Sequence, residues 1–217
     1  MLRDITTIVL NVPAALIALS VHEFAHGYVS SKLGDPTPRA QGRLTLNPMA
    51  HLDPIGTLLM IFTGFGWAKP VQINPMYYKD RTKGMALTAA AGPVSNFIMA
   101  FIGMLIGVIL ACILSSAGVS GSVVSWILTF TSVFTQLNLC FMVFNLIPFP
   151  PLDGFKIFGM FMPRNVYYKI LQYEHYIMYA LMLLCLLGVF SSIIGTGVSF
   201  VYRLIYGAVM NIVGLFF

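Results

Sequence analysis

The chain has 217 residues, of which 58% are hydrophobic and only 9% are charged, whereas a soluble domain carries about 25% charged residues. Together with a mean hydropathy of +0.86, this composition predicts a membrane protein and excludes an ordinary soluble domain. The net charge of +5 does not indicate nucleic-acid binding. The basic residues lie in the loops between apolar runs, which is the distribution typical of a membrane protein.

An apolar, uncharged run near the start of the chain leads into the motif His22-Glu23-Phe24-Ala25-His26. Residues 5–32 are enough for a membrane-spanning helix, which needs roughly 20 residues, and a Gly-Asp-Pro sequence ends it. Because His22 and His26 are four residues apart, they share one helix face and can bind one metal ion. Glu23 is placed to take a proton from an attacking water. Buried histidine pairs can also be structural, but placing them with a Glu in hydrocarbon is costly.

The polar part of the chain follows, over residues 35–83. Within it, the weak alternation of residues 40–46 predicts a short strand or hairpin arm. Residues 55–65 are apolar but too few to cross a bilayer, which predicts a re-entrant or interfacial segment. His51 has several open roles: a partner of a metal ligand, a substrate contact, a regulatory ligand that blocks the metal, or a structural residue at the membrane interface.

Four further apolar runs predict spans at residues 84–114, 123–147, 173–190 and 198–217, which makes about five transmembrane helices in all. Gly103 and Gly107 on the second span have the GxxxG spacing that permits close helix contact. The sequence contains no repeat and no segment typical of a soluble accessory domain. It therefore predicts one membrane-embedded domain over 1–217, with a catalytic core at about 5–160 and C-terminal helices at about 165–217.

The basic residues predict the orientation in the cytoplasmic membrane. Ten of the twelve Lys and Arg residues lie in the 32–83 and 152–172 loops, and the loops at 115–122 and 191–197 hold none. By the positive-inside rule, the basic loops are cytoplasmic. With five spans, the N-terminus is then expected outside, and the C-terminus and the histidine pair on the cytoplasmic side.

A catalytic zinc takes three protein ligands and keeps one position open for water, so the histidine pair needs a third ligand. The candidates are the remaining His, Asp and Glu residues: His51, His175, Asp4, Asp35, Asp53, Asp80, Asp153 and Glu174. Asp153 is favoured because the third span returns it to the membrane face where the histidines lie. Prolines before it break the helix and Gly154 after it frees the backbone, although a lone Asp in a loop is usually a cap or turn residue.

Two motifs together resemble the site-2 protease family of intramembrane zinc metalloproteases. One is the His22–His26 motif, and the other is Asn145-Leu146-Ile147-Pro148-Phe149-Pro150-Pro151-Leu152-Asp153-Gly154 at the end of the third span. Ala91-Gly92-Pro93-Val94-Ser95-Asn96 on the second span is similar to a further family element. The resemblance covers about residues 5–160. Within the family, the chain most resembles short bacterial members that begin directly with the histidine helix and have no PDZ or CBS domain.

The resemblance implies the site residues. His22, His26 and Asp153 would bind one zinc ion per chain, and Glu23 would be the catalytic base. It also implies a membrane-associated β element at 38–47, whose exposed edge could hold an unwound substrate by β-augmentation.

Two asparagines in the spans are further candidates. Asn96 and Asn145 could steady the oxyanion or position the substrate, although Asn in a span more often makes a hydrogen bond between helices.

The expected fold is an all-α polytopic membrane protein with a three-helix catalytic core, a small β element and a re-entrant segment. The expected function is hydrolysis of a peptide bond in or near a transmembrane segment of membrane-protein substrates, within the lipid bilayer. Two alternatives stay open: a transporter-like protein with a structural metal site, and an inactive relative that serves as a binding scaffold. The sequence does not indicate the oligomeric state.

Overall fold

The computed structural model describes residues 5–63 and 66–216; Asp4, one of the candidate ligands, lies outside them. The α-helices are α1 Ile5–Lys32, α2 Thr37–Ala40, α3 Pro54–Thr63, α4 Arg81–Ser116, α5 Gly121–Asn145, α6 Asp153–Phe158, α7 Arg164–Leu171, α8 Glu174–Leu186 and α9 Ser191–Val213. Three short 3-10 turns lie at Pro48–Ala50 (η1), Pro75–Tyr77 (η2) and Gly159–Phe161 (η3).

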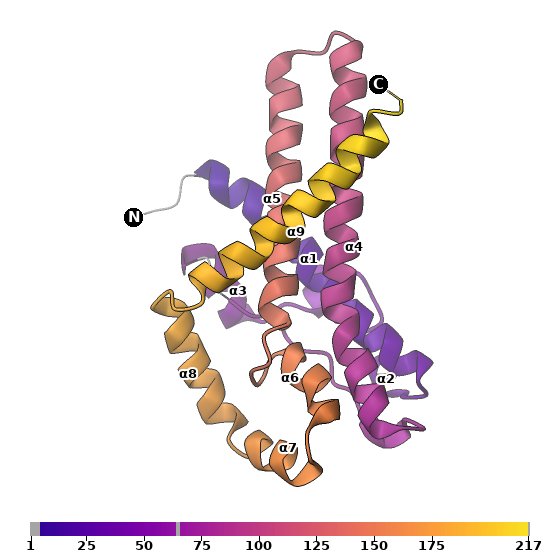
Figure 1. Ribbon diagram of the computed structural model, residues 1–217, viewed down its shortest axis with the longest axis vertical. Coiled ribbons are helices and arrows are strands. Elements are labelled where there is room, and N and C mark those ends of the chain that lie inside the picture. Colours follow the sequence, from indigo (N-terminus) through magenta and orange to yellow (C-terminus); the bar gives the residue numbers. More distant parts are fainter. Residues whose placement is uncertain (1–4, 64–65, 217) are drawn as a thin grey trace.

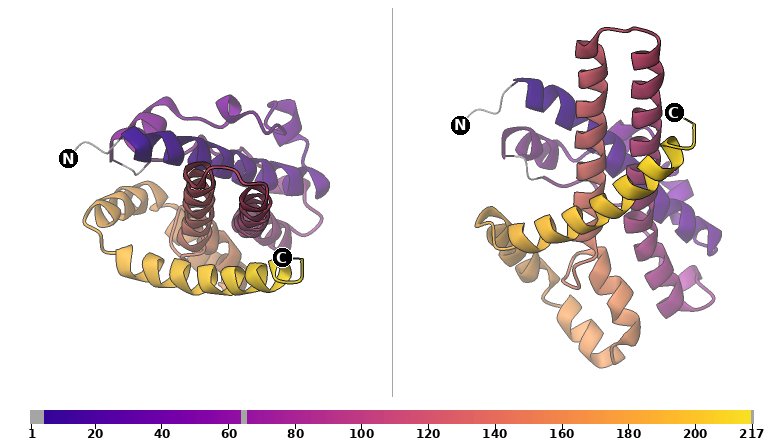
Figure 2. Two further views of the ribbon diagram at one scale, coloured as in Figure 1. Left: turned by 90° about the horizontal axis from the view of Figure 1, so that it is seen from above. Right: turned by 45° about the horizontal axis from the view of Figure 1, so that its top comes forward.

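Four helices within the described ranges are long and apolar enough to cross a membrane, namely α1, α4, α5 and α9. They coincide with four of the predicted spans, although α9 begins at Ser191, earlier than expected. The long hairpin of α4 and α5 forms the middle of the molecule (Figure 1). Figure 2 shows α1 on one side of this hairpin and α9 on the other.

The remaining predicted span, at residues 173–190, falls on α8. This helix has 13 residues and is about 20 Å long at 1.5 Å per residue, whereas the hydrocarbon core of a bilayer is about 30 Å thick. α8 therefore cannot cross a bilayer by itself. Gly188, with φ +72°, lies in the turn that leads from α8 into α9.

The predicted β element at 38–47 is wrong. In place of a strand the chain forms the short helix α2 and a turn, and the described residues contain no sheet beyond an isolated antiparallel bridge between Leu52 and Ala68. The reason is local: Pro36 and Pro38 fix φ near the helical value and start a helical turn. The amide of Arg43 closes that turn by donating to the Pro38 carbonyl over 2.9 Å.

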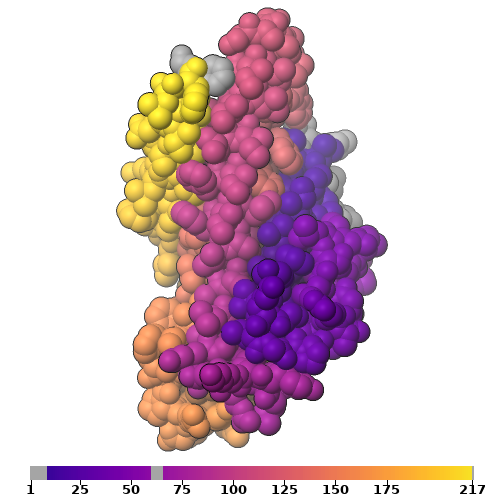
Figure 3. All heavy atoms as spheres, turned by 90° about the vertical axis from the view of Figure 1, so that its right-hand side faces the viewer, coloured from indigo at the N-terminus to yellow at the C-terminus, as the bar shows by residue number. Residues whose placement is uncertain are grey.

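The core lies where α4, α5 and α9 meet. Its buried members are Ala100, Met104, Leu139, Met142, Ile205, Val209 and Val213. The GxxxG prediction is confirmed on α4: a Cβ on Gly107 would lie 2.0 Å from the Thr131 hydroxyl, and one on Gly103 would lie 2.7 Å from the Phe134 ring. The space-filling view shows α4 between α9 and the α1 side of the molecule (Figure 3), so α4 forms part of both the core and the site described next.

Candidate metal centre

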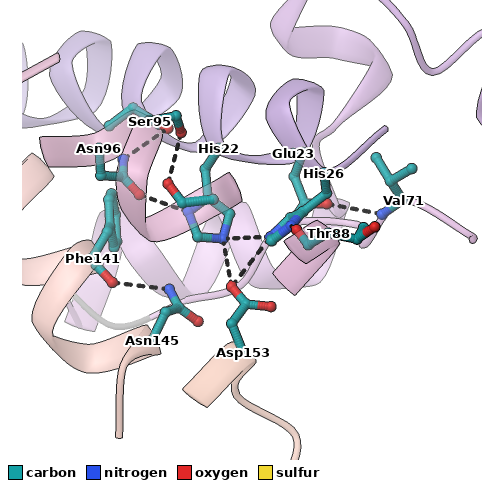
Figure 4. Close-up of polar contacts among 12 residues, drawn as sticks. His22, Glu23, His26, Val71, Thr88, Ser95, Asn96, Phe141, Asn145 and Asp153 are labelled. Carbon is teal, nitrogen blue, oxygen red and sulfur yellow. Dashed lines mark hydrogen bonds and ion pairs between the residues drawn. The ribbon is translucent and has the colours of Figure 1, made fainter. Parts of the chain in front are cut away.

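α1 presents two imidazoles on one buried face. His22 is 5% exposed and His26 is 9% exposed, and their Nε2 atoms lie 3.0 Å apart. The separation of four residues accounts for this, because 3.6 residues make one helical turn and both rings project toward α4. Figure 4 shows the two rings with their Nε2 atoms facing each other.

Asp153 completes the group from the opposite side (Figure 4). It is the first residue of α6, and its Oδ2 lies 3.2 Å from the Nε2 atom of each histidine. The turn after α5 brings it there, and Gly154 is needed because a Cβ on it would lie 2.4 Å from the Leu146 carbonyl oxygen. Within the described chain, His22, His26 and Asp153 form the one cluster of at least three His, Cys, Asp or Glu side chains that could hold a metal ion.

Hydrogen bonds at the far side of each ring fix the tautomers. His22 Nδ1 lies 2.6 Å from Asn96 Oδ1, and His26 Nδ1 lies 2.7 Å from the carbonyl oxygen of Thr88. Both partners accept, so each Nδ1 carries the proton and donates, and each Nε2 is left with a lone pair. The Asn96 oxygen faces His22 because its amide nitrogen donates to Asn138 Oδ1 over 3.1 Å.

These donor atoms fit a zinc ion. Three atoms that carry lone pairs lie within 3.0 to 3.2 Å of one another, and Asp153 Oδ2 is buried with no hydrogen-bond donor in the described structure. Such a group is repulsive unless a cation lies among its members. For tetrahedral zinc with bonds of about 2.0–2.1 Å, neighbouring ligand atoms are about 3.3 Å apart. Two neutral imidazoles and a carboxylate are also a ligand set that zinc uses in hydrolases.

Gly92 on α4 leaves the room for this group. A Cβ at this position would lie 2.5 Å from His26 Nε2 and 2.6 Å from His22 Nε2. No side chain larger than hydrogen fits there without moving the rings.

Glu23 lies beside the imidazole pair, on the side of the segment that precedes α4 (Figure 4). Its Oε2 accepts a hydrogen bond of 2.8 Å from the backbone amide of Val71. Val71 belongs to the segment 68–74, which lies between α3 and η2 and which we call the strap. The carboxylate is thus held by a backbone group 48 residues away in sequence.

The two candidate asparagines lie in different surroundings. Asn96 is fully buried and uses both ends of its amide, accepting from His22 and donating to Asn138 and Ala18, which favours a role in orienting His22. Asn145 donates to the carbonyl of Phe141, one turn earlier in α5, over 3.0 Å. Figure 4 shows Asn145 on the same side of the imidazole pair as Asp153.

The other candidate ligands do not join the cluster. His51 is buried, and its Nε2 donates to the carbonyl of Thr45 over 2.8 Å. Asp53 and Asp80 accept from backbone amides at the starts of α3 and α4. Asp35 accepts hydrogen bonds from Ser30, Thr37 and Asn74 and lies outside the cluster. Glu174 and His175 lie at the start of α8 and belong to no such group in the described structure.

Sequence reasoning missed several residues that build the site. Asn138 is a polar residue inside an apolar run, and that signal could have identified it. Thr88 and Val71 contribute backbone atoms, which leave no signature in the side-chain sequence.

The model of peptidase family M50 matches residues 12–188. The chain is 42% identical over 167 residues to "Putative zinc metalloprotease YwhC" of Bacillus subtilis (strain 168), a match that covers 74% of this chain and 73% of that protein. It is 27% identical over 153 residues to "Putative zinc metalloprotease Rip2" of Mycolicibacterium smegmatis, covering 68% of this chain and 55% of that protein. No solved structure matches.

Proposed function

The chain belongs to peptidase family M50, the site-2 protease family, and we propose that it is an intramembrane zinc endopeptidase which cleaves other membrane proteins in or near a transmembrane segment. The observation that carries the proposal is the meeting of three lone-pair atoms from His22, His26 and Asp153 beside the Glu23 carboxylate, inside a bundle of apolar helices. Carboxylates and imidazoles are costly to bury inside membrane-spanning helices, so they are rare there and usually serve a function.

One zinc ion per chain would be held by His22 Nε2, His26 Nε2 and Asp153 Oδ2. When bound there, zinc supplies Lewis-acid polarisation of the scissile carbonyl and lowers the pKa of water toward neutrality. Asn96 and the Thr88 carbonyl keep the two Nε2 lone pairs directed at the ion, because each accepts the Nδ1 proton of one ring.

Glu23 is the proton carrier of the proposed reaction. Its carboxylate accepts a proton from the attacking water and later gives that proton to the nitrogen of the leaving amine. The Val71 amide restrains one carboxylate oxygen, so the other stays available for the water. Asn145, at the end of α5, is the candidate to steady the oxygen of the tetrahedral intermediate.

The substrate class follows from the surroundings of the site. The helices that carry it are apolar enough to span a membrane, so a substrate that reaches it is itself a membrane protein. We place the whole chain in one membrane-embedded domain of the cytoplasmic membrane, with the site toward the cytoplasmic side as the basic loops predict. A helical substrate must unwind before its carbonyl is open to attack, because its backbone hydrogen bonds are made internally.

The proposal is tested by measuring bound zinc and cleavage of a model transmembrane substrate by the purified protein. Glu23→Gln is expected to retain zinc and to lower the cleavage rate by about 10²–10⁴-fold, the usual contribution of a general base. Glu174→Gln is the matched control, because it changes the chain's other glutamate, at the start of α8. It should retain the full cleavage rate.

The same two measurements separate the alternatives. Bound zinc without cleavage by the unmodified chain favours the scaffold. Absence of bound zinc favours the transporter-like protein. Cleavage that persists in Glu23→Gln contradicts the role of this carboxylate.

A further inference from the structure

Asp35, three residues after the end of α1 at Lys32, is a buried carboxylate with no place in the proposed reaction. It is 1% exposed and accepts three hydrogen bonds, from the Ser30 hydroxyl at 2.7 Å, the Thr37 amide at 2.9 Å and the Asn74 amide at 2.7 Å. Burial raises the pKa of this carboxyl. The hydrogen bonds from Thr37, Asn74 and Ser30 together lower it by more than burial raises it, so the pKa lies below its ordinary value. Asp35 is therefore an anion at neutral pH.

One branch of this network leads to Glu23 through the strap. Three backbone amides of the strap donate to other parts of the chain: Lys69 to the His51 carbonyl, Val71 to Glu23 and Asn74 to Asp35. The strap is held further at its start, where the Arg43 guanidinium donates to the Lys69 carbonyl. Asp35 fixes the end of the strap that lies three residues beyond Val71. The position of the Val71 amide, and with it the orientation of the Glu23 carboxylate, depends on that attachment.

The second branch leads to His26. The Ser30 hydroxyl contacts the Tyr78 hydroxyl over 2.8 Å, and the Tyr78 hydroxyl contacts the hydroxyl of Thr88 over 3.1 Å. The carbonyl of Thr88 accepts the Nδ1 proton of His26. Ser30, Tyr78 and Thr88 are all buried, at 0%, 5% and 1% exposure, so water does not compete for these bonds.

We infer that Asp35 is a positioning residue that holds both halves of the reactive site, fixing Glu23 through the strap and the His26 ring through Ser30, Tyr78 and Thr88. The inference rests on the proposed function, because it assigns Asp35 a role in that reaction. The Asp35 carboxylate thereby sets the relative position of Glu23 and His26. Both residues belong to α1, but the strap holds Glu23 whereas Thr88 of α4 holds His26.

Asp35→Asn tests the whole network. The substitution keeps the shape but leaves one acceptor oxygen for three donors, so at least one donor faces the new amide group. We expect hydrogen–deuterium exchange of the strap to become about tenfold faster, the zinc dissociation constant measured by chelator competition to rise about tenfold, and kcat to fall with KM unchanged. Asp80→Asn is the control, since Asp80 caps α4 outside this network, and should alter none of the three.

Ser30→Ala separates the two branches with a smaller change. It removes the bridge to Tyr78 but leaves the attachment of the strap to Asp35, so zinc affinity should fall while exchange of the strap stays at the unmodified rate. Ser31→Ala is the matched control, because the Ser31 hydroxyl is buried and has no hydrogen-bond partner in the described structure.

Unchanged strap exchange and zinc affinity in Asp35→Asn would overturn the inference. Faster exchange spread evenly over all helices would also overturn it, because that pattern indicates a general loss of stability. If Asp35→Asn does not fold, Ser30→Ala decides: zinc affinity equal to that of Ser31→Ala overturns the inference. Exchange of the strap needs neither zinc nor substrate, so its result stands apart from a failure of the proposed function, which would appear as absent zinc or cleavage in the unmodified chain.

Discussion

At the scale of single residues, the site depends on neighbours that make each ligand atom available. The Asn96 oxygen and the Thr88 carbonyl take the Nδ1 protons and leave the Nε2 lone pairs facing Asp153. Gly92 contributes by having no side chain at the place where the rings meet. The identity of these neighbours therefore governs metal affinity although none of them is a ligand.

Gly92→Ala is expected to abolish tight zinc binding. The new methyl group would lie 2.5 Å from His26 Nε2, far inside van der Waals contact, so the rings must separate. We expect a loss of zinc affinity at least as large as the roughly 10–100-fold that follows removal of a ligand's hydrogen-bond partner. Chelator competition measures it, with Gly207→Ala as the control, because a Cβ there meets nothing within 4 Å. Wild-type zinc affinity in Gly92→Ala would contradict this account.

The sequence predicted the three residues that meet at this site, although their role as ligands stays a prediction. Helical periodicity placed the two histidines together, and the order of the spans placed Asp153 at the same depth. The orienting groups were less accessible to sequence reasoning, because Thr88 and Val71 act through backbone atoms whose direction only the folded chain defines. The networks of Asn138 and Asp35 depend on contacts between residues far apart in sequence.

At the scale of elements, α4 connects the site to the rest of the bundle. It supplies Thr88, Gly92 and Asn96 to the site, and further along it packs against α5 through Gly103 and Gly107. Because the same helix performs both tasks, close packing against α5 helps to hold the wall on which the histidine rings rest.

Gly107→Ala is expected to destabilise the α4–α5 pair. Alanine would gain about 1 kcal/mol of helix propensity, but its Cβ would lie 2.0 Å from the Thr131 hydroxyl. Overpacking of this kind typically costs about 1–3 kcal/mol, so the net free energy of unfolding should fall. Thermal unfolding in detergent measures the change, and Thr131→Ala in the same chain should recover part of it. If the Gly107→Ala protein is as stable as the Gly207→Ala protein, the close contact between Gly107 and Thr131 does not limit the stability of the α4–α5 pair.

Not every element followed from its local pattern. The helices α1, α4 and α5 were predicted because long apolar runs leave few alternatives. The segment at 38–47 was predicted as a β element partly from a weak alternation, but Pro36 and Pro38 favour a helical turn. A two-residue period over so few positions is a weaker signal than two prolines with fixed φ.

At the scale of the whole molecule, the number of membrane crossings determines on which side of the membrane the end of α9 lies. α8 begins beside α7, at the end of the molecule away from the α4–α5 turn, and α9 then runs toward the side of that turn (Figures 1 and 2). α8 is too short to cross alone, whereas α9 has 23 residues, about 35 Å at 1.5 Å per residue. We therefore propose that α8 and α9 make one crossing between them, in place of the two that the hydropathy pattern predicts.

This arrangement predicts that the end of α9 lies on the same side of the membrane as the α4–α5 turn. Single cysteines at Ser120, Asn165 and Leu215, in a chain whose own cysteines are replaced by alanine, can be labelled in intact cells with a maleimide that does not cross membranes. We expect Ser120→Cys and Leu215→Cys to react from outside and Asn165→Cys to react only after permeabilisation, since the loop of Asn165 is basic. Five separate crossings would instead make Leu215→Cys behave like Asn165→Cys, because an additional span reverses the side on which the chain emerges.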